Sequence, residues 1–176
     1  MSNIVVYESK YGSTAKYAKW IGEELKCKVA RISDVSIEEL KNYDNIIFGS
    51  WIHAGKLEGF KNLSNNIDIL KDKNILVFAV GLSETEDKSY QQFKELNFKN
   101  FKKLKSYYFR GAFHFKNLAF IDKTKMRMFK IILKRQKAEK KNEETIGMMR
   151  NSAEAVDYTN KEAIEEIVKM ARILNL

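Results

Sequence analysis

The chain has 176 residues, one cysteine, no proline and a formal net charge of +9, which predicts a single α/β domain over residues 1–176. It has no run of about 18 apolar residues and no signal-peptide pattern, so we expect a cytoplasmic protein. The lone Cys27 excludes an internal disulfide and a multi-cysteine metal site, and we interpret it as a structural thiol.

Five apolar runs predict strands, at residues 3–7, 27–32, 45–50, 74–80 and 107–113. Val, Ile and Phe dominate them, which is typical of parallel strands covered on both faces. Apolar residues at helical spacing lie between most of these runs: Ala15, Ala18, Ile21 and Leu25; Phe60, Leu63, Ile67 and Leu70; and Tyr90, Phe93 and Leu96. The alternation predicts a parallel sheet with helical crossovers.

Two capping-box spacings mark expected helix starts. Ser36 with Glu39 precedes a short helical turn, and Thr159 with Glu162 precedes a closing helix near the C-terminus. The closing helix is expected from an apolar stripe over residues 164–174.

The turn between the first strand and the first helix predicts a phosphate cradle. It consists of Ser9, Lys10, Tyr11, Gly12, Ser13 and Thr14. Its hydroxyls, together with the unpaired backbone N–H groups of a helix start, can surround a phosphate, and Gly12 permits close approach of the main chain. The alternative is an ordinary helix cap.

Two further loops are expected beside this cradle, because the carboxyl ends of parallel strands share one edge of a sheet. The loop after the third strand contributes Ser50, Trp51, Ile52, His53, Ala54 and Gly55, and the loop after the fourth contributes Gly81, Leu82 and Ser83. No catalytic triad, metal-ligand cluster or paired-carboxylate pattern accompanies them. Redox or other reactive chemistry would therefore belong to a cofactor.

The cradle motif Ser9-x-Tyr11-Gly12-x-Thr14 resembles the phosphate loop of the flavodoxin family, with Tyr11 in place of a hydroxyl residue. The resemblance implies a doubly wound sheet of order 2-1-3-4-5 that binds flavin mononucleotide (FMN) where strands 1 and 3 diverge. It also implies that Trp51 covers the flavin ring and that a carbonyl of Ala54-Gly55 accepts a hydrogen bond from reduced flavin. The lack of a Gly-x-Gly-x-x-Gly fingerprint favours FMN over FAD.

A closer resemblance is to the flavodoxin-like, menaquinone-dependent protoporphyrinogen dehydrogenases of bacterial haem synthesis. It is carried by Gly49-Ser50-x-Ile52-x-x-Gly55, Arg110-Gly111-Ala112, Tyr158-Thr159 and a basic stretch after the fifth strand. It implies electron flow from a porphyrinogen through FMN to a quinone or another acceptor. The alternatives are an FMN electron carrier without its own substrate, and a basic interaction domain that keeps the fold without flavin.

The basic stretch covers residues 116–141, where ten basic and two acidic residues give +8 of the total charge. A helix there would be apolar on one side and cationic on the other. We expect a docking surface made of Met126, Arg127, Phe129, Lys130, Leu133 and Lys134. Its expected partner is a carboxylate-bearing substrate, an acidic redox partner or an anionic membrane contacted peripherally from the cytoplasmic side, whereas a solvated packing helix is the alternative. No nucleic-acid motif accompanies the charge, so nucleic acid is not expected.

Overall fold

The computed structural model describes residues 2–53, 56–82, 94, 95, 98, 104–113 and 156–175. The first half contains β1 (Asn3–Tyr7), α1 (Ser13–Leu25), β2 (Lys28–Arg31), the 3₁₀ helix η1 (Ile32–Asp34), α2 (Ile37–Leu40), β3 (Asn45–His53), β4 (Lys56–Leu57) and α3 (Phe60–Ser64). The second half contains β5 (Asn74–Gly81), β6 (Lys105–Arg110), β7 (Ala112–Phe113), β8 (Val156–Asp157), the 3₁₀ helix η4 (Lys161–Ile164) and α7 (Glu165–Ile173).

The central sheet has the order β2-β1-β3-β5-β6, and all four pairings along this path are parallel. The short strand β4 pairs only with β3, so β5 and β6 are the fourth and fifth predicted strands. The observed order therefore confirms the predicted doubly wound order 2-1-3-4-5. The contiguous apolar run Ile46-Ile47-Phe48 lies in the middle strand β3 and is fully buried, as expected for a strand covered on both faces. The chain reverses its winding between β1 and β3, so their carboxyl ends diverge at that point.

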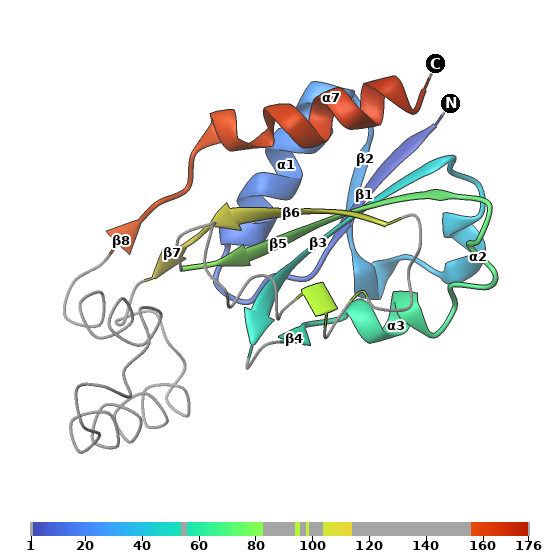
Figure 1. The fold of residues 1–176 in the computed structure, drawn as a ribbon, viewed down its shortest axis with the longest axis horizontal. Helices are drawn as coiled ribbons and strands as arrows, with labels where there is room; N and C mark the ends of the chain where they lie inside the picture. The colour runs from blue at the N-terminus through green and yellow to red at the C-terminus, as the bar shows by residue number, and fades with distance from the viewer. Residues whose placement is uncertain are drawn as a thin grey trace.

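Helices cover both faces of the sheet (Figure 1). On one face, α1 and α7 lie side by side over Val5, Ile47 and Phe78. The opposite face is covered near α2 and α3, where Phe60 packs against Phe48 with ring centroids 5.6 Å apart. Two apolar layers therefore fix the sheet and hold its carboxyl edge in place.

The strand ends differ from the prediction in two places. β3 continues to His53 and folds back on β4, with Ile52 opposite Leu57, so the expected loop after the third strand begins as a hairpin. The fifth predicted strand, 107–113, is divided at Gly111, whose N–H donates to the Gly81 carbonyl at 2.7 Å. Beyond that glycine, β7 leaves the sheet and pairs antiparallel with β8.

The helices also differ in detail. The second predicted stripe is helical only over Phe60–Ser64, although Leu70 beyond it is still buried. The third predicted stripe, at residues 90–96, lies outside the described residues except for position 95. Ser36 caps α2 as predicted, because its side chain accepts the Glu39 N–H at 3.1 Å.

The cap of the closing helix is one residue later than predicted. Asn160, and not Thr159, caps η4 by accepting the Glu162 N–H at 3.0 Å. Thr159 uses its hydroxyl to donate to Asp157 at 2.6 Å instead.

An asparagine ladder crosses the amino-terminal edge of the sheet. The Asn45 amide donates to the side-chain oxygens of Asn3 at 2.8 Å and Asn175 at 2.6 Å, and Asn74 donates to the Asn45 oxygen at 2.8 Å. Asn45 is completely buried. The ladder joins β1, β3 and β5 to Asn175, two residues beyond the closing helix, and both chain ends lie at this edge (Figure 1).

Candidate functional site

The carboxyl ends of β1, β3 and β5 bring the predicted site segments to one edge of the sheet. Tyr7 lies opposite Gly49, and Trp51 lies opposite Val80. Just beyond β1, the Glu8 N–H donates to the Gly49 carbonyl at 2.9 Å. The loop after β1 is therefore tied to the middle strand before it enters α1.

The loop 9–12 forms a backbone cradle at the start of α1. Ser9 is buried, and its hydroxyl accepts the Gly12 N–H at 3.2 Å. Gly12 is the N-cap and adopts a φ of 97°, in the left-handed region that favours glycine. A β-carbon at Gly12 would meet nothing within 4 Å, so open space adjoins the helix start. Because Gly12 has no side chain, it does not cap the N–H groups of the first turn of α1. Uncapped N–H groups at a helix start are the arrangement expected at an anion site.

The two hydroxyls at the start of α1 differ in their surroundings. Ser13 accepts the Ala112 N–H at 2.9 Å, which ties α1 to β7. Because a hydroxyl that accepts a hydrogen bond keeps its own proton, both Ser9 and Ser13 can still donate to a ligand. Thr14 is buried in the first turn of the helix.

Aromatic and cationic side chains gather beside the cradle. The Lys10 ammonium lies 5.3 Å from the Tyr11 ring centroid and 5.5 Å from that of Trp51. Trp51 also contacts His53, with ring centroids 5.2 Å apart. The sequence predicted these four residues for the site, and the structure brings them together between the β1 loop and the end of β3.

The predicted residues on the deeper side of the site are fully buried at Ser50 and half-buried at Ile52, Gly81 and Leu82. Ser50 is 0% exposed, and its hydroxyl has no hydrogen-bond partner among the described residues. Ile52 packs partly against the core, and Leu82 lies just past β5. At Gly81 a β-carbon would come within 2.4 Å of the Tyr108 hydroxyl, so a larger residue there would require the Tyr108 side chain to shift.

A stem made of β7 and β8 docks on the first turns of α1, a feature that sequence reasoning missed. Lys16 donates to Thr159 at 2.6 Å and pairs with Asp157 at 3.3 Å. The buried Tyr17 donates its hydroxyl proton to the Arg110 carbonyl at 2.7 Å and accepts the Asn160 N–H at 3.1 Å. The only sequence signals were the separate motifs at 110–112 and 158–159, which gave no pairing.

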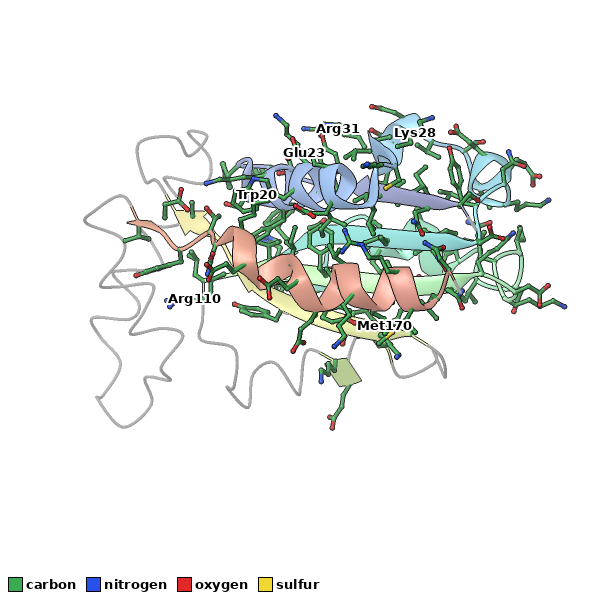
Figure 2. All side chains as sticks on the ribbon, turned by 90° about the horizontal axis from the view of Figure 1, so that it is seen from above. Trp20, Glu23, Lys28, Arg31, Arg110 and Met170 are labelled. Atoms are coloured by element: carbon green, nitrogen blue, oxygen red, sulfur yellow. The ribbon has the colours of Figure 1, made fainter. Side chains whose placement is uncertain are left out.

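Electrostatics of the stem follow from these contacts. Hydrogen bonds from Thr159, reinforced by Lys16, hold the pKa of the Asp157 carboxyl below its usual value. Burial raises the pKa of Tyr17, and the nearby Asp157 charge adds to this, against the Asn160 hydrogen bond. The guanidinium carbon of Arg110, which Figure 2 labels, lies 3.9 Å from the Tyr158 ring centroid, a close cation–π contact at the end of β6.

Several predicted residues lie outside the described part of the chain. They are Ala54, Gly55, Ser83 and the docking residues Met126, Arg127, Phe129, Lys130, Leu133 and Lys134. Among the residues that the structure describes, no group of His, Cys, Asp and Glu side chains is arranged to hold a metal ion. None of the described helices has the length and apolar character needed to cross a bilayer.

Comparison with known proteins identifies the family. The sequence model of the flavodoxin domain matches residues 4–140. An uncharacterized protein of Methanocaldococcus jannaschii is 32% identical over 91 residues, which cover 51% of this chain and 51% of that protein. The matched region thus spans about half the length of this curated relative.

Solved structures of flavodoxins are also similar. An archaeal flavodoxin is 22% identical, with 62% of this chain and 85% of that chain covered and a TM-score of 0.42. Oxidised flavodoxin 2 from Bacillus cereus is 20% identical over 61% and 84%, with a TM-score of 0.41. A Fusobacterium nucleatum flavodoxin variant bound to flavin mononucleotide is 16% identical over 62% and 69%, with a TM-score of 0.40. Because the family model covers most of its length, this chain belongs to the flavodoxin domain family.

Proposed function

We propose that this protein binds FMN across the carboxyl ends of β1, β3 and β5 and works as a redox flavoprotein. The observation that carries the proposal is the open N-cap of α1, where Gly12 has a φ of 97° and free space beside it. This cap lies where β1 and β3 diverge, which is the position for ligands in open α/β sheets. Membership of the flavodoxin domain family supports the same ligand.

The residues present fit both ends of FMN. For the phosphate, the first-turn backbone of α1 and the hydroxyls of Ser9, Ser13 and Thr14 offer donors. For the flavin ring, Trp51 and Tyr11 offer aromatic surface, and the buried Ser50 hydroxyl offers a hydrogen bond to a polar ring atom. Bound FMN would supply the transfer of one or two electrons, which no described side chain can perform.

A flavin titration of the purified protein tests this proposal. The double variant Ser9→Ala, Thr14→Ala should bind FMN about 5- to 150-fold more weakly, from about 1 to 3 kcal/mol of lost or unsatisfied hydrogen bonds. A control pair, Ser2→Ala with Ser64→Ala, removes one hydroxyl before the amino end of β1 and one at the end of α3, both away from the cradle, and should leave binding unchanged. Equal FMN affinity in the Ser9/Thr14 variant and its parent would show that the cradle is misassigned.

We further propose an oxidoreductase of the protoporphyrinogen dehydrogenase type, which passes electrons from substrate through FMN to a quinone or another acceptor. The support is the resemblance at 49–55, 110–112 and 158–159. A second observation favours a substrate of its own: Phe113 and Val156, which flank the long basic segment in the sequence, pair with each other beside the cradle. The alternative is an electron carrier without its own substrate, and the strongly positive charge speaks against it.

The basic stretch gives the discriminating experiment. Replacing Arg127, Lys130 and Lys134 with Gln should leave FMN content normal while porphyrinogen oxidation or binding to anionic vesicles falls. Each charge can be worth about 1 kcal/mol near an anionic surface, and added salt should weaken the attraction.

The control for this experiment changes the same net charge elsewhere. Lys19, Lys61 and Lys71 are exposed, and their replacement with Gln should affect neither activity. The electron carrier would be favoured if the Arg127, Lys130 and Lys134 variant kept both porphyrinogen oxidation and vesicle binding. It would also be favoured if the parent protein showed neither of them at low salt. The cytoplasmic location, with peripheral membrane contact, is part of the same proposal.

A further inference from the structure

Arg31, the last residue of β2, reaches across to the segment that enters the cradle. One guanidinium nitrogen lies 3.3 Å from a Glu8 carboxylate oxygen, and another donates to the Ser9 carbonyl at 3.3 Å. The register of the sheet makes this reach short, because Arg31 lies opposite Tyr7 on the neighbouring strand. Figure 2 shows Arg31 on the side of α1 away from Arg110.

Backbone contacts fix Glu8 at the entrance of the cradle. The carboxylate oxygen that meets Arg31 also accepts the Ser9 N–H at 3.0 Å. The Glu8 N–H is bound to Gly49 on β3, so the residue cannot move away without breaking the link between β1 and β3. A carboxylate is therefore held next to Ser9, whose hydroxyl takes the Gly12 N–H.

This placement creates an electrostatic problem for an anionic ligand. A phosphate monoester carries up to two negative charges near pH 7, and a bare carboxylate beside its site would repel it. Two other described cations lie nearby but make other contacts: Lys10 lies over two aromatic rings, and Lys16 pairs with Asp157. Arg31 is the cation that contacts Glu8.

We propose that Arg31 is a positioning residue that neutralises Glu8, orients Ser9 and so makes the cradle selective for phosphorylated over unphosphorylated flavin. This inference rests on the proposed FMN site. The pair is poorly placed to stabilise the fold, because the side chains of Arg31 and Glu8 are 48% and 29% exposed and surface ion pairs contribute little. We therefore expect the pair to change the relative affinity for FMN and riboflavin more than the stability of the fold.

The test is a charge cycle on the apoprotein, with dissociation constants measured for FMN and riboflavin by flavin fluorescence at low salt. Arg31→Gln should weaken FMN binding about tenfold and leave riboflavin binding and the melting temperature nearly unchanged. Arg31→Lys should keep most of the FMN affinity. The double variant Glu8→Gln, Arg31→Gln should regain most of the parent affinity, because it removes the repelling charge as well.

A matched control is Arg172→Gln, which breaks a surface pair with Glu24 on α1, outside the cradle, and should change neither constant. A double variant as weak as Arg31→Gln would overturn the proposal, since Arg31 would then act on the phosphate directly. Equal losses for FMN and riboflavin, or no loss at all, would also overturn it. A parent protein that binds neither flavin would refute the FMN site itself, and this inference with it.

Discussion

Replacing Tyr17 with Phe tests how firmly the stem holds the start of α1. Tyr17 is 1% exposed, and its ring packs against Phe109 with centroids 4.8 Å apart, an arrangement that Phe preserves. Only the hydroxyl is lost, and with it the hydrogen bonds to the Arg110 carbonyl and from the Asn160 N–H. The variant therefore isolates the polar link between α1, β6 and the segment before η4.

The expected cost follows from what each partner loses. Asn160 is exposed, so water can replace its contact at about 0.5 to 1.5 kcal/mol. The Arg110 carbonyl lies in a half-buried residue and would lose a bond of 2.7 Å, which costs about 1 to 3 kcal/mol if water does not reach it. Tyr17→Phe should thus lower the free energy of unfolding by about 1.5 to 4.5 kcal/mol.

Urea unfolding followed by circular dichroism measures this change. Tyr107→Phe is a suitable control, because this tyrosine lies on the same strand as Arg110 and no hydrogen bond of its hydroxyl is seen within the described residues. Its variant should stay within about 0.5 kcal/mol of the parent. A Tyr17 variant as stable as the Tyr107 variant would refute the reasoning.

The same variant has a pH signature. Burial raises the folded-state pKa of Tyr17, so above about pH 10 the unfolded chain loses this proton first and the parent loses stability as pH rises. The stability difference between the parent and Tyr17→Phe should therefore shrink in alkali. A difference that grows there would contradict the assigned burial.

Two further predictions concern buried polar groups. Asn45→Ala should lower the free energy of unfolding in urea by about 2 to 4 kcal/mol, because it breaks three side-chain hydrogen bonds. Asn74→Ala breaks only one of these bonds and should cost less. The reverse ranking would contradict the ladder. Burial raises the pKa of the Cys27 thiol to about 11, so its alkylation at pH 8 should be about 100-fold slower than that of a free thiol. The alkylation rate should rise to that of a free thiol when the protein is unfolded in urea. Fast alkylation of the folded protein would refute this burial.

The sheet was predictable from sequence because its signals are local. The apolar run of β3 and the repeat of Ala18 and Ile21 in α1 each lie within one element, so periodicity alone identifies them. Right-handed crossovers and the family resemblance then leave one strand order. The cradle was predictable for the same reason, since Ser9 to Thr14 are contiguous.

The missed features depend on contacts between distant segments. β7 and β8 are two residues each, too short for any pattern, and their pairing joins residues 113 and 156. The Arg31–Glu8 contact requires the register of β1 and β2, which the hydrophobic pattern does not specify because no residue of the edge strand β2 is fully buried. The cap of η4 was misassigned because Thr159 and Asn160 are both capping residues, and only the tertiary contact with Asp157 and Lys16 decides between them.

The start of α1 is held from three directions before any ligand arrives. Glu8 ties it to β3, Arg31 ties it to β2, and the stem ties it through Ser13 and Tyr17. A site whose backbone is already fixed loses less conformational entropy on binding, which favours affinity for a ligand as small as a phosphate group. The same arrangement makes the stem and the cradle share one helical turn, so the ligand binds best to the state in which the contacts of Ala112 and Asn160 are formed. By reciprocity, the Tyr17→Phe change should weaken flavin binding as well as folding.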